Sequence, residues 1–193
     1  MTKFLTLKHW QLFVLLVGVP LIVEFIMFGF VFSHRDPRFF LYFFPFLMIL
    51  SLGLFFSWFY TLGANLFKRL PETAKMNLTK FKIFLFIPVV YILFFMVFMF
   101  GMFSNISSGG QPGPVRGEQP GLIIFAVIFP LHLFCMFCMF YCLYFNAKAL
   151  KTVELQKPVT FSDFAGEFFL LWFFPIGVWI VQPRINKLFD TGA

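Results

Sequence analysis

The sequence predicts an all-α integral membrane protein, a bundle of four transmembrane helices plus a short fifth segment that is broken by Pro and Gly. Three observations lead to this class. Of the 193 residues, 61% are hydrophobic and 12% are charged, whereas soluble domains carry about 25% charged residues. The 36 Phe residues exceed what a single water-exposed domain could bury, and four apolar segments are each long enough to cross a bilayer. We therefore expect a single transmembrane domain over residues 1–193, with lipid as its main solvent.

The four predicted spans follow from segment length. A bilayer core about 30 Å thick needs about 20 apolar residues in a helix. The segments that meet this requirement are 10–32, 39–64, 83–103 and 122–145. Because backbone amides in lipid must be hydrogen-bonded within the chain, we expect these segments to be helices and not strands. Residues 104–120, between the third and fourth spans, are rich in Gly, Pro and Ser and are predicted to form a flexible external loop.

The loop charges predict the orientation. The N-terminal tail and the second and fourth loops together carry ten Lys and Arg residues, whereas the first and third loops carry three. By the positive-inside rule, the side with the excess is cytoplasmic, so the N-terminus is predicted to be cytoplasmic. The net charge of +7 is spread over these loops and not gathered into a stripe. This distribution suits anionic lipid headgroups and argues against a nucleic-acid partner.

The fifth segment, residues 164–182, is short for a span. Its uninterrupted apolar part contains 14 residues, which would rise about 21 Å as a helix, and Pro175 and Gly177 lie near its middle. A half-inserted segment that bends and returns would place Trp172 and Trp179 at one depth near the headgroups, where Trp is favoured. We favour this form over a thinned or tilted fifth span.

Two polar side chains lie deep within the predicted spans. Glu24 is acidic and well inside the first span, and His132 lies at a similar depth in the fourth. A carboxylate there costs roughly 2.5–3.5 kcal/mol, so it must be protonated, paired or in contact with water. If the two side chains meet, one interpretation is a proton or ion relay. We favour the other, a buried hydrogen-bonded pair that fixes helix register.

Sulfur-containing side chains follow helical spacing in two of the predicted spans. They are Cys135, Cys138 and Cys142, on the same face as His132, and Met96, Met99 and Met102 in the third span. Thiolate, thioether and imidazole ligands suit Cu(I), which makes this face a candidate soft-metal site. We favour simple packing, because free Cys and Met act as adaptable apolar residues and ligands along one helix lie at different heights. We therefore predict no cofactor.

Amides and charges of both signs gather near the predicted cytoplasmic face. The candidates for docking a partner there are Asn65, Glu72, Asn146, Glu154, Glu167 and Arg184. A surface that mixes both signs suits a protein partner, but ordinary solvated loops at the headgroups are the simpler interpretation.

The last third of the chain contains the motifs KTVEL, FSDFAGEFF and PIGVWIVQPRIN. Through them, the last sixty or so residues resemble small polytopic membrane proteins of Bacteroidetes-type bacteria. The resemblance implies a multi-pass protein of the bacterial inner (plasma) membrane, and it carries no activity and no functional residue.

The sequence contains no phosphate-binding glycine loop, Ser-His-Asp set or zinc-type ligand spacing. We therefore expect a non-enzymatic membrane subunit or accessory protein of a larger membrane complex, whose partners are the lipid bilayer and other membrane protein subunits. The alternative is a small transporter or channel for a proton, an ion or a soft metal that uses Glu24 and the His132/Cys face.

Overall fold

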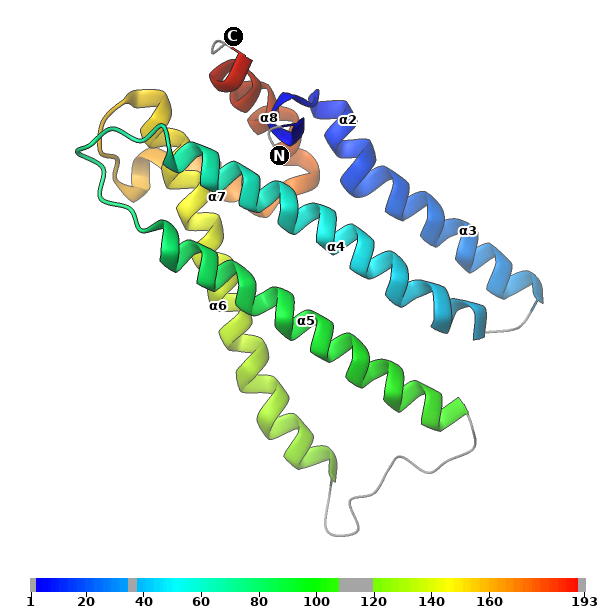
Figure 1. Ribbon diagram of the computed structural model, residues 1–193. Coiled ribbons are helices and arrows are strands. Elements are labelled where there is room, and N and C mark those ends of the chain that lie inside the picture. Colours follow the sequence, from blue (N-terminus) through cyan, green and yellow to red (C-terminus); the bar gives the residue numbers. More distant parts are fainter. Residues whose placement is uncertain (1–2, 35–37, 108–119, 191–193) are drawn as a thin grey trace.

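The computed structural model describes residues 3–34, 38–107 and 120–190, and within them every regular element is a helix (Figure 1). Four helical stretches of the described chain are long and apolar enough to cross a membrane. They are His9–Ser33, Phe43–Phe67, Leu78–Gly101 and Ala126–Leu155. The predicted all-helical architecture, with four helices of spanning length, is confirmed.

The first long helical run is not uniform. After α1 (Lys3–Thr6), it consists of α2 (His9–Phe13), a wider π-helical stretch η1 (Val14–Gly18) and α3 (Val19–His34). The backbone N–H of Val19 donates to the carbonyl of Val14, five residues earlier. Pro20 follows at once, and proline lacks an N–H and clashes with the carbonyl four residues before it. The wider turn accommodates that clash, as π-type bulges in helices do.

The next three helices are longer than the predicted spans. They are α4 (Arg38–Phe67), α5 (Leu78–Ser107) and α6 (Pro120–Leu155). The 36 residues of α6 extend about 54 Å, well beyond a hydrocarbon core of about 30 Å. Asn65 and Asn146 follow the predicted second and fourth spans directly, yet both lie inside helices. Part of the predicted external loop is also helical, up to Ser107 and again from Pro120; residues 108–119 lie outside the described residues.

The predicted fifth segment forms two helices, α7 (Phe161–Trp172) and α8 (Phe174–Asp190). The backbone N–H and the hydroxyl of Thr160 both donate to the Asp163 carboxylate, each at 2.8 Å, which caps the start of α7. The helix breaks at Phe173, two residues earlier than the Pro175–Gly177 break that the sequence suggests. Pro175 falls in the first turn of α8, where a missing N–H costs no hydrogen bond.

Gly177 makes the sharp turn between α7 and α8 possible. A Cβ at this position would lie 1.6 Å from the carbonyl oxygen of Leu170 in α7, so no larger residue fits. The N–H of Gly177 donates to the Phe173 carbonyl at 2.8 Å, across the turn. The resulting C-terminal helix pair, α7 and α8, packs against the end of α6 and against α1 and α2.

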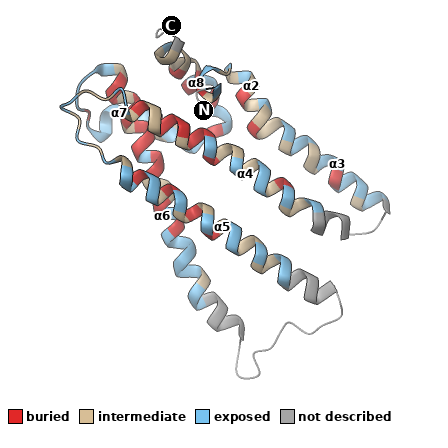
Figure 2. Ribbon diagram, viewed as in Figure 1, coloured by how far each residue is buried: buried red, intermediate tan, exposed pale blue. Residues whose placement is uncertain are grey.

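The core is concentrated at one end of the bundle (Figure 2). The large side chains there that are almost fully buried include Trp58, Phe59, Phe81, Phe145, Phe164 and Ile185. The start of α1 and the end of α8 lie at this end as well (Figure 1). The C-terminal helix pair follows the end of α6 and finishes beside the start of the chain, so it does not run the length of the bundle.

Candidate functional site

Four charged side chains from three helices meet beside the C-terminal helix pair. Arg184 of α8 donates to both carboxylate oxygens of Glu154 in α6, from Nε to Oε1 at 2.7 Å and from Nη2 to Oε2. The same Nη2 lies 2.6 Å from Oε1 of Glu167 in α7. Lys151 of α6 donates to that Glu167 oxygen at 3.1 Å. We call Lys151, Glu154, Glu167 and Arg184 the charge cluster; it joins α6, α7 and α8.

The charge cluster contains two acidic and two basic side chains. Glu167 and Arg184 lie outside the four candidate spans, whereas Lys151 and Glu154 lie near the end of the span Ala126–Leu155. Burial alone would raise the pKa of Glu167, but hydrogen bonds from Arg184 and Lys151 hold that pKa below its usual value. The hydrogen bonds to Glu154 and Glu167 raise the pKa of Arg184 above its ordinary value. Glu167 and Arg184 are therefore charged at neutral pH. These charged groups hydrogen-bond to one another, so the arrangement links the helices that carry them.

Three of the predicted docking residues thus face each other inside the chain. These are Glu154, Glu167 and Arg184, and sequence reasoning did not include their fourth partner, Lys151. The sequence could have indicated Lys151 as a member of this group, because Lys151 and Glu154 are three positions apart and so share a face of a helix. Glu72 is exposed in the connection after α4.

The two predicted amides serve helix packing. Asn65 donates to the Thr61 carbonyl of its own helix at 2.7 Å. Asn146 is fully buried in α6 and donates to the Phe59 carbonyl of α4 at 3.3 Å, across the interface. Gly63 of α4 faces it: a Cβ there would lie 2.5 Å from Oδ1 of Asn146. A small residue at this position lets the two backbones approach closely, as is common between membrane helices.

His132 has a partner that the sequence did not reveal. Its Nδ1 lies 3.2 Å from the hydroxyl of Tyr91 in α5. Both residues line a cavity of about 320 Å³ between α5, α6 and the C-terminal helix pair, together with Cys135 and Trp172.

Glu24 lies apart from this cavity. It is half-buried in α3, which packs against α4, whereas His132 is on α6 beyond α5 (Figure 1). Within the described chain, Glu24 makes no hydrogen bond or ion pair. The structure therefore does not bring the two polar residues together, either as the hydrogen-bonded pair that the sequence analysis favours or as a relay.

The three cysteines are free and buried. Cys142 lies against α5, with its Sγ 3.9 Å from the Phe81 carbonyl oxygen. Met96 and Met99 are half-buried on α5, and the side chain of Met102 lies outside the described residues. Among the residues that the structure describes, no three His, Cys, Asp or Glu side chains are grouped so that they could hold a metal ion. The thiols fill space between helices, as small apolar residues do.

Comparison with known proteins finds no match to any protein-family model, curated protein or solved structure. What this chain does must therefore be inferred from its own side chains and their arrangement.

Proposed function

We propose that this chain is a non-enzymatic integral membrane protein, a subunit or accessory protein of a larger membrane complex. The observation that supports this role is the uneven packing of its long helices. The core lies at one end, whereas large apolar side chains farther along the spans are exposed (Figure 2). Phe25 and Phe32 of α3 and Val97 of α5 are 75%, 79% and 74% exposed.

Uneven packing matters because lipid tails are as apolar as the side chains they touch. Helices in a bilayer associate through close van der Waals contact and hydrogen bonds, without a hydrophobic driving force. Helices that pack closely at one end leave the contact surface at the other end free for another membrane protein. The charge cluster supports a structural role as well, since its charges are engaged with one another.

We further propose the bacterial inner membrane as the location, with the N-terminus in the cytoplasm. The excess of Lys and Arg on that side supports this orientation. Since α8 finishes beside α1, the same orientation places the end of α8 on the cytoplasmic side, and the C-terminal helix pair then returns without crossing.

Purification in mild detergent tests the subunit role. A photo-crosslinking residue at Phe25 or Val97 should give an adduct with one discrete protein, and a stoichiometric partner should co-purify. A crosslinker at the exposed loop residue Lys157 is the control and should give no such adduct. A lone, monodisperse chain with no discrete adduct at either apolar position would contradict the proposal.

The cavity at His132 favours a second candidate, a small transporter or channel for a proton or an ion. A histidine and a tyrosine in hydrogen-bonding contact beside a cavity inside the membrane can pass a proton. In reconstituted vesicles, His132→Phe should abolish proton or ion flux that the native chain supports. Flux that is unchanged in both His132→Phe and Glu24→Gln would remove these residues from any transport mechanism.

A further inference from the structure

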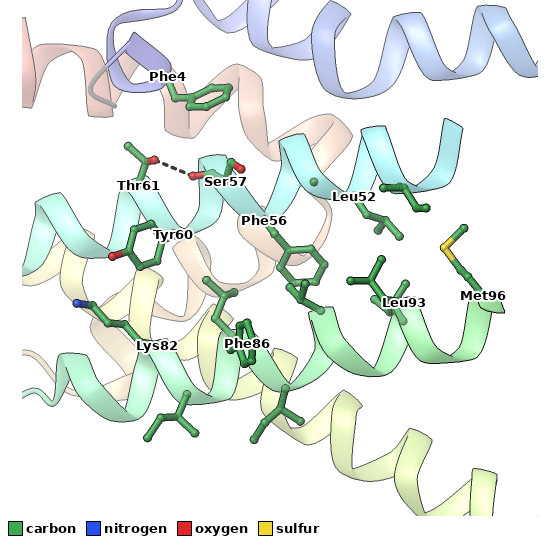
Figure 3. Close-up of a pocket in the computed structure, with 17 residues that line it drawn as sticks. Phe4, Leu52, Phe56, Ser57, Tyr60, Thr61, Lys82, Phe86, Leu93 and Met96 are labelled. Carbon is green, nitrogen blue, oxygen red and sulfur yellow. Dashed lines mark hydrogen bonds between the residues drawn. The ribbon is translucent and has the colours of Figure 1, made fainter. Parts of the chain in front are cut away.

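A groove of about 800 Å³ runs along the interface of α4 and α5 (Figure 3). Its walls are apolar over most of their length, from Phe56 and Phe86 to Leu52, Leu93 and Met96. The polar side chains of the lining lie towards the other end, on α4 and α5, as Figure 3 shows. They are Ser57, Tyr60, Thr61 and Lys82. The groove is therefore amphipathic along its length.

The polar end carries an unneutralised positive charge. The Lys82 ammonium lies 6.0 Å from the centre of the Tyr60 ring and has no acidic partner within the described chain. The Thr61 hydroxyl donates to the Ser57 carbonyl at 2.7 Å and is engaged by its own helix. Lys82, with Tyr60 beside it as Figure 3 shows, thus forms an end of the groove that complements an anion.

The length of the groove matches one leaflet of a bilayer. Lys82 and Met96 are 14 positions apart on α5, a rise of about 21 Å. Half of a bilayer, headgroups included, is about 20–22 Å thick. Gly53 widens the apolar part of the groove, because a Cβ there would meet no atom within 4 Å. A lipid acyl chain therefore fits along the groove while its headgroup lies at Lys82.

We propose that this groove holds one anionic phospholipid, with its phosphate paired to Lys82 and an acyl chain along α4 and α5 towards Met96. On the orientation proposed above, it is a lipid of the cytoplasmic leaflet. The site is independent of the subunit role, because it needs no partner protein.

Native mass spectrometry of the purified full chain tests headgroup selection. After delipidation, the chain is offered phosphatidylglycerol and phosphatidylcholine in equal amounts, and one phosphatidylglycerol should be retained in preference. Lys82→Gln should weaken phosphatidylglycerol binding about tenfold, as expected for the loss of one charge-assisted contact. Lys80→Gln is the matched control: it removes the same charge from an exposed position outside the groove and should leave binding unchanged.

A second pair of variants tests the groove itself. Gly53→Phe should fill the apolar part and abolish retention of either lipid, whereas Gly29→Phe, in equally open space on α3, should retain phosphatidylglycerol. Equal retention of both lipids by the native chain, with no effect of Lys82→Gln, would identify ordinary annular lipid and overturn the proposal. Phosphatidylglycerol bound undiminished to Gly53→Phe would also overturn it.

Discussion

Removing Arg184 should cost this fold a large part of its stability. Arg184→Met keeps an unbranched apolar stem but removes the guanidinium that binds both Glu154 and Glu167. Breaking a buried ion pair costs about 3–5 kcal/mol, because one charge is left uncompensated, whereas fully exposed pairs contribute about 0–1 kcal/mol. Glu167 is 7% exposed but keeps Lys151, and Arg184 itself is 29% exposed. We therefore expect a loss of about 2–3 kcal/mol.

Reversible unfolding in mixed detergent micelles measures this loss. Trp172 and Trp179 belong to the C-terminal helix pair, so their fluorescence should report its release. Trp179 is packed against His9 and Phe13 at centroid distances of 4.9 and 5.4 Å, which makes it sensitive to separation of α8 from α2. Lys157→Met is the control, because it removes an exposed positive charge and should change stability by less than about 0.5 kcal/mol.

A double-mutant cycle then separates the charge cluster from simple packing. If Arg184 and Glu167 act together, Arg184→Met and Glu167→Gln should couple by about 0.5–3 kcal/mol. A single-variant loss below about 0.5 kcal/mol, or two losses that add without coupling, would refute the view that these charges hold the helix pair in place.

Three further predictions concern the same end of the bundle. Folding lowers the pKa of Glu167. The contribution of Glu167 to the free energy of unfolding is therefore complete above its unfolded pKa of about 4.3, and it is lost as the pH falls through the folded pKa. Acid titration of stability should therefore show a decline below about pH 4 that is shallower in Glu167→Gln, and identical declines would count against it. Gly177→Ala should destabilise the chain by at least about 1–3 kcal/mol, because its Cβ would overlap the Leu170 carbonyl. The control Gly166→Ala, in open space, should be neutral or slightly stabilising in the same unfolding assay. Equal stabilities of the two variants would contradict the steric argument. In a chain whose native cysteines are replaced by Ala, a Cys added after Ala193 should react with an impermeant reagent from the same side as a Cys placed at Thr2, and labelling from opposite sides would show that the helix pair crosses.

The long helices could be predicted because apolar length alone specifies them. Their ends could not, because a span ends where the bilayer ends and a helix ends where its packing ends. Asn146 illustrates the difference: it is polar enough to end an apolar run, yet it lies fully buried where α6 contacts α4. The π-helical stretch before Pro20 was also missed, although Pro20 itself was visible in the sequence.

The candidate site was predicted in composition but not in arrangement. Glu154, Glu167 and Arg184 were identified as a mixed-charge group, yet their pairing depends on the turn at Phe173, which directs α8 back across α6 and α7. Their similar depth suggested a contact between Glu24 and His132, but depth says nothing about which helices are neighbours. The order of packing, with α4 and α5 between them, is a property of the folded chain.

The contact between α8 and the start of the chain has a consequence for synthesis. Gln182 donates to the carbonyls of Phe4 and Leu7, at sequence separations of 178 and 175 residues, and Asn186 also donates to Leu7. Contacts between such distant residues close slowly, because the intervening chain must be ordered first. The carbonyl groups of Phe4 and Leu7 therefore lack these donors until residues 182 and 186 have been synthesised, and bind water or other proteins in the meantime. Ribosomes that stop before residue 182 would release a chain whose first helix lacks its contacts with α8, and such products should be early targets for membrane proteases.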